Sequence, residues 1–148
     1  MAHLSAAKML YALALETAFK AVIVRDRPAE VQFKTKTDSA GNVVFAELMQ
    51  IGVSKGAGHS LSALAEKTEV FHRGGNPIFA TDADVTSARA TVDELSAFIT
   101  WIGRYPTPTR ADQHPNYPVP PLSDAWGDDM RRWTDPMLDR LHGLAESV

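Results

Sequence analysis

Four residues of this chain could bind or attack an anionic group such as a phosphate. Arg104 and Tyr105 stand in the segment Trp101-Ile102-Gly103-Arg104-Tyr105-Pro106, directly after a glycine that can end a helix. A guanidinium can hold a phosphate through two parallel hydrogen bonds, and the phenol can donate a third. His59 is a candidate general base, and His114 is a candidate acid or base if its loop folds over Arg104.

Glu16 and Lys20 form a second candidate pair, four residues apart within a long apolar segment. Ligand binding or catalysis is one interpretation, because buried charges often mark functional sites. An ion pair that fixes helix register, inside a bundle or at a dimer seam, is the other. Structural roles are also open for the other candidates: His59 precedes a plausible helix cap, and Arg104 can pair with an acidic residue.

The composition excludes several kinds of site. The chain has no cysteine, so disulfides, thiolate zinc sites and a cysteine nucleophile are excluded. The five histidines are far apart and no glycine-rich phosphate loop is present, so we expect neither a metal nor a cofactor. A net charge of −3 argues against a dedicated nucleic-acid binder that relies on phosphate neutralisation, but local basic patches remain open.

The elements that must position these residues are mainly helical in pattern. A first helix is expected from the cap Ser5 to about Val24, and it is apolar on two opposite sides. One side is the stripe of Leu10, Leu13, Ala14, Thr17, Ala21 and Val24. Such a helix is typical of a bundle centre or of an oligomer interface. Its charged residues make it a poor signal peptide and a poor membrane span, so we expect a cytoplasmic protein without membrane contact.

Further helices follow along the chain. One is expected to begin near Ser60, and another to run from the cap Thr81 to about Gly103. Six prolines predict an extended loop over 106–121. The C-terminal segment 122–148 is helical in pattern, with Asp135 as a cap before a helix that starts at Pro136.

Residues 29–57 are the least decided part and read as an insertion. Val31 and Phe33 alternate with polar residues, a turn-like segment spans 38–42, and Val43-Val44-Phe45 follows. A small β-hairpin at about 31–50 and a disordered insertion are both consistent with this pattern. The sequence therefore predicts a single all-α domain over 1–148, an up-down helical bundle with either of these additions.

Three stretches resemble a known family. Leu13-Ala14-Leu15-Glu16-Thr17-Ala18-Phe19-Lys20-Ala21 resembles the first helix of HEPN domains, and Gly58-His59-Ser60-Leu61-Ser62-Ala63-Leu64 resembles the opening of their second helix. The segment 101–106 resembles the W-x-x-RYP motif of one branch. The resemblance implies a HEPN-like helical bundle, often dimeric and tied to nucleic-acid processing, conflict systems or toxin–antitoxin pairs. Many members are metal-independent ribonucleases in which an arginine precedes a histidine by five to seven positions.

This chain departs from that ribonuclease pattern, because His114 follows Arg110 by four positions and Arg104 by ten. The first hypothesis is therefore a non-catalytic HEPN-like module, a homodimer that binds RNA, a nucleotide or a protein partner near Arg104 in a prokaryotic defence-type system. One alternative is a divergent metal-independent ribonuclease or toxin that uses Arg104 with His59 or His114. A second alternative is a structural subunit of a larger complex.

Overall fold

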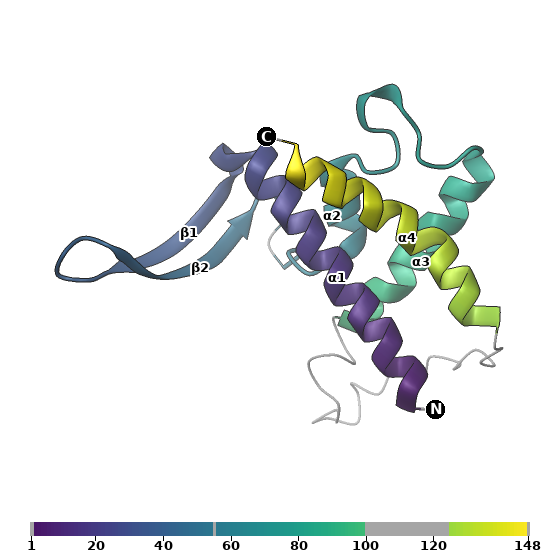
Figure 1. Cartoon of the computed structure of the whole chain (residues 1–148), viewed down its shortest axis with the longest axis horizontal. Coiled ribbons are helices and arrows are strands. Elements are labelled where there is room, and N and C mark those ends of the chain that lie inside the picture. The colour runs from purple at the N-terminus through teal and green to yellow at the C-terminus, as the bar shows by residue number, and fades with distance from the viewer. Residues whose placement is uncertain (1, 55, 100–124, 148) are drawn as a thin grey trace.

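The computed structural model describes residues 2–54, 56–99 and 125–147 of the chain, and it shows a mixed α/β fold (Figure 1). The described elements, in chain order, are α1 (Ala2–Asp26), η1 (Pro28–Glu30), β1 (Val31–Thr37), β2 (Val43–Ile51), α2 (Leu61–Thr68), η2 (Arg73–Gly75), α3 (Asp82–Ala97) and α4 (Ala125–Glu146). The prediction of an all-α bundle is therefore wrong. The sequence left two interpretations of residues 31–50 open, a β-hairpin and a disordered insertion. The structure shows the hairpin, made of two antiparallel strands.

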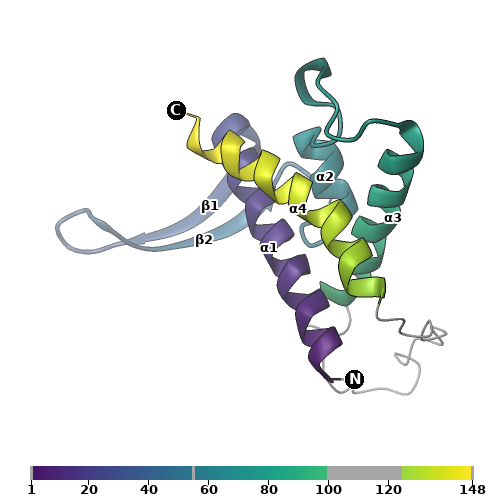
Figure 2. The ribbon, with the colours of Figure 1, turned by 45° about the vertical axis from the view of Figure 1, so that its right-hand side comes forward.

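Helix α1 packs against each of the other three helices (Figure 2). One face of α1 is fully buried, because its apolar residues recur at helical spacing. This face carries Ala12, Leu15, Phe19, Val22 and Ile23. Burying each of its large apolar side chains contributes about 1.5–3 kcal/mol, so the α1 face is a substantial part of the core. No helix among the described residues combines the length and the apolar character needed to cross a bilayer.

The second and third helices begin where their capping residues predict. The Ser60 hydroxyl accepts a hydrogen bond from the Ala63 amide, and the Thr81 hydroxyl accepts one from the Asp84 amide. Asp84 in turn accepts a hydrogen bond from the Thr81 hydroxyl at 2.8 Å, which adds a side-chain bond to the cap. The Ser60 cap fixes the start of α2 just after His59.

Helix α4 does not begin at Pro136, as its sequence predicts, but runs through that residue. A proline inside a helix removes one backbone hydrogen bond and disfavours helical geometry. Tertiary packing outweighs this cost, because residues on both sides of Pro136 enter the same core. Met130, Thr134, Met137 and Leu141 are each at most 3% exposed.

The hairpin of β1 and β2 projects from the C-terminal end of α1 (Figure 1). Its turn is held by Asp38, whose carboxylate accepts hydrogen bonds from the Ala40 and Asn42 amides, both at 2.9 Å. The base of the hairpin ends at Gly52, which has a φ of +68°. A Cβ there would lie 2.9 Å from the Cβ of Glu30, so glycine fits for two reasons.

Candidate functional site

Glu16 is the centre of the candidate site. It lies on the flank of α1 and its side chain is only 10% exposed. One of its oxygens, Oε1, accepts a hydrogen bond from Lys20 Nζ at 2.5 Å and lies 2.6 Å from His59 Nδ1. Glu16 and Lys20 meet because residues four apart share a helix face, while Glu16 and His59 are 43 positions apart in the chain. We call these three residues the Glu–Lys–His trio.

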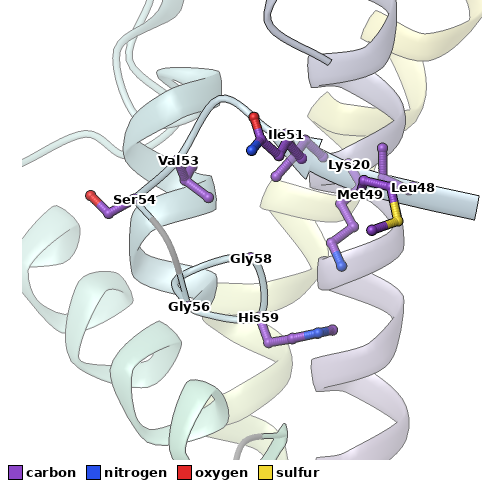
Figure 3. Close-up of a pocket in the computed structure, with 10 residues that line it drawn as sticks. Lys20, Leu48, Met49, Ile51, Val53, Ser54, Gly56, Gly58 and His59 are labelled. Atoms are coloured by element: carbon purple, nitrogen blue, oxygen red, sulfur yellow. The ribbon is translucent and has the colours of Figure 1, made fainter. Parts of the chain in front are cut away.

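The position of His59 follows from the helix that it precedes. Because Ser60 caps α2, His59 is held at the entrance to that helix and its ring points toward α1 (Figure 3). An ionised carboxylate oxygen only accepts hydrogen bonds, so His59 Nδ1 carries the hydrogen. In the neutral ring, Nε2 is then the basic nitrogen, the tautomer that a carboxylate typically imposes on a histidine base.

A cavity of about 500 Å³ lies beside the trio (Figure 3). Lys20 and His59 are on one wall, and the base of the hairpin is on another. Its lining residues are Lys20, Leu48, Met49, Gln50, Ile51, Val53, Ser54, Gly56, Gly58 and His59. Glu16 is not among the residues that line the cavity, but it bonds to both Lys20 and His59, which are. This volume falls in the range of small-molecule sites.

The lining of the cavity combines hydrogen-bonding side chains with apolar ones. Lys20 carries three donor hydrogens and the Glu16 bond uses one of them. With His59 neutral, the trio has no net charge; with His59 protonated, it carries one positive charge. Among the described residues, no group of three or more His, Asp or Glu is placed to hold a metal ion.

The structure brings together three of the residues singled out in the sequence, Glu16, Lys20 and His59. Arg104, Tyr105 and His114 lie outside the described residues, so their relation to the trio stays a prediction.

Sequence reasoning missed the contribution of the hairpin base to the cavity. Leu48, Gln50 and Ile51 belong to the segment that reads as an insertion, yet they form a wall of the cavity. A signal was present: a strand-like segment ends in Gly52, and the glycines at 56 and 58 lead directly into His59. That spacing leaves few residues between strand and histidine, which keeps the two close in space.

A second polar region, at the C-terminal end of α1, is structural. Asp26 accepts a hydrogen bond from Arg25 at 2.7 Å and another from Arg73. Partial burial acts to raise the pKa of Asp26, but the hydrogen bonds and charges of the two arginines outweigh it and lower the pKa below its usual value. Asp26 therefore faces two cations, and its bond to Arg73 links α1 to η2.

Comparison of the chain with protein families, with curated proteins and with solved structures finds no match. The resemblance to HEPN domains therefore remains a prediction.

Proposed function

We propose that the chain is a HEPN-like binding module that forms a homodimer through α1 and holds an anionic ligand, a nucleotide or an RNA phosphate, beside the Glu–Lys–His trio. The observation that carries the proposal is that Lys20 and His59, which line the cavity, both bond to one oxygen of the buried Glu16. Two of the three stretches that resemble the family supply these residues. We propose a binding role in a prokaryotic defence-type system, without catalysis.

The ligand class follows from the two kinds of surface in the cavity. Lys20 supplies hydrogen-bond donors for an anionic group, His59 supplies a further donor at Nε2 when its ring is protonated, and Glu16 holds both side chains in place. Leu48, Ile51 and Val53 provide apolar surface for a base or another flat group. A nucleoside monophosphate has both features and is small enough for a cavity of about 500 Å³.

The experiment is a calorimetric titration of the full chain with AMP and with adenosine. We expect AMP to bind at least about tenfold more tightly than adenosine, and Lys20→Met to remove this preference. Lys34→Met is the matched control, because it removes the same charge from the exposed strand β1. Equal affinity of the two variants for AMP, or no AMP binding by the wild type, would contradict the proposal.

The dimer proposal rests on the outer face of α1. The stripe of Leu10, Leu13, Ala14, Thr17, Ala21 and Val24, which we call the α1 stripe, is exposed apart from the half-buried Val24. Small residues at its centre allow two helices to approach closely. We expect Ala14→Lys to dissociate the dimer in sedimentation velocity, while Ala90→Lys, at an exposed position of α3, leaves it intact. A wild-type monomer at all concentrations would refute the dimer.

A divergent ribonuclease is the second candidate, favoured by the hydrogen bond between Glu16 and His59. A carboxylate that orients a histidine is a common arrangement for a general base. In this alternative His59 or His114 acts with Arg104 on the RNA backbone. Cleavage of a fluorescent RNA that is lost in His59→Asn would favour it, and RNA that stays intact with the wild type would refute it.

A further inference from the structure

The large apolar side chains that remain exposed gather in two places. Among the residues that the structure describes, two of them, Leu10 and Leu13, belong to the α1 stripe. The others are all on the hairpin: Phe33, Val43, Val44, Phe45 and Met49, with exposed fractions between 44% and 64%. Single exposed apolar residues are ordinary, but a set confined to two patches marks an interaction surface.

The two patches lie toward opposite ends of α1. Leu10 and Leu13 are in its N-terminal half, whereas the hairpin follows its C-terminal end, where only η1 and Arg27 separate Asp26 from Val31 (Figure 1). A helix rises about 1.5 Å per residue, so the sixteen positions from Leu10 to Asp26 span roughly 24 Å. One copy of the chain therefore leaves its two patches well separated along α1.

We infer that the hairpin is an arm that packs on α1 of a second copy of the chain. The inference rests on the α1 dimer proposed above. When two α1 stripes pair about a two-fold axis perpendicular to the helices, they run antiparallel. The N-terminal half of one α1 then lies beside the C-terminal half of the other, where the arm begins. The arm thus meets the partner's Leu10 and the partner's Leu13, and each patch covers the other.

The size of the α1 stripe supports this arrangement. Stable interfaces use roughly 20–30 residues per partner, whereas the stripe offers six. The arm adds surface on the same side, because Lys20, at the edge of the stripe three residues after Thr17, lines a cavity together with Leu48 and Met49 at the base of the hairpin.

The two strands of the arm expose different kinds of side chain. Strand β1 exposes Lys34 and Lys36, which oppose pairing with another strand. Strand β2 exposes most of the apolar residues of the arm, among them Val44 at 64%. Strand β2 therefore supplies most of the contact with the second copy. Lys36 is the cross-strand neighbour of Phe45, and its ammonium lies 5.6 Å from the centre of the Phe45 ring.

The test is sedimentation velocity on a concentration series of the full chain. We expect Val44→Lys to weaken the dimer by about tenfold or more, because it places a charge in an apolar contact. Thr35→Lys adds the same charge to β1 and should leave the dimer unchanged. A wild-type dimer that Val44→Lys does not weaken overturns the arm but keeps the α1 dimer. A wild-type monomer overturns the proposed dimer, and the arm contact with it.

A second measurement covers the case in which Val44→Lys fails to fold. The chain has no cysteine, so a double variant Leu10→Cys, Val44→Cys carries only the two introduced thiols. A short bismaleimide should join two copies and give a covalent dimer on a denaturing gel. Only monomeric product, from protein that sediments as a dimer, would overturn the arm.

Discussion

Replacing Glu16 by glutamine should destabilise the fold and loosen Lys20 and His59 together. Hydrogen bonds to charged groups contribute about 1.5–3 kcal/mol each where they are shielded from water. Lys20 and His59 are 22% and 40% exposed, so both can regain water, and the glutamine oxygen keeps one acceptor. The free energy of unfolding should therefore fall by about 1.5 kcal/mol, which lowers the melting temperature by about 3–6 °C.

The assay is urea unfolding followed by circular dichroism, with Glu66→Gln as the matched control. Glu66 also pairs with a cation, Arg89, but its side chain is 59% exposed. An exposed ion pair contributes little, so the control should lose at most about 0.5 kcal/mol. Equal losses in the two variants would refute the reasoning that Glu16 is a buried anchor.

Two further predictions concern the base of the hairpin and the ion network at the end of α1. Gly52→Ala should destabilise the fold by about 2 kcal/mol in the same urea assay, because φ is +68° and the new Cβ would crowd Glu30. Gly58→Ala is the control: its new Cβ would have no atom within 4 Å, so stability should change by less than about 0.5 kcal/mol. The folded pKa of Asp26 lies below its ordinary value of 3.8, so ionised Asp26 stabilises the fold above that pH and the contribution disappears as the pH falls through the folded pKa. Asp26→Asn should therefore be less stable than the wild type near pH 7, and the difference should shrink as the pH falls through the folded pKa of Asp26; a difference that does not shrink in acid would contradict this.

Two helix starts were predictable from local chemistry, whereas the first helix begins at Ala2 and not after the expected cap Ser5. Ser60 and Thr81 cap their helices as their side chains predict, and the core face of α1 follows from helical spacing. The predicted helix start at Pro136 was wrong, because the packing of residues on both sides of Pro136 outweighs the one backbone hydrogen bond that the proline removes.

The fold class could not be predicted because the strand pattern is interrupted. Val43, Val44 and Phe45 are consecutive apolar residues, and the pairing of β1 with β2 shifts register twice. Each irregularity breaks the alternation that identifies a strand from sequence. A hairpin and a disordered insertion therefore looked alike.

The candidate site was predictable in its residues but not in its geometry. Glu16 and Lys20 are neighbours on one helix face, which spacing alone reveals. The contact of His59 with Glu16 depends on the path of the chain from Ile51 to Ser60, which periodicity does not specify. The cavity wall from the hairpin was missed for the same reason.

The most direct test of the anion site is a two-dimensional ¹H–¹⁵N NMR titration of the isotope-labelled chain with AMP. We expect the largest shift changes on the polar residues that line the cavity, which are Lys20, Gln50, Ser54 and His59. Shift changes confined to other parts of the chain, or none at saturating AMP, would contradict it.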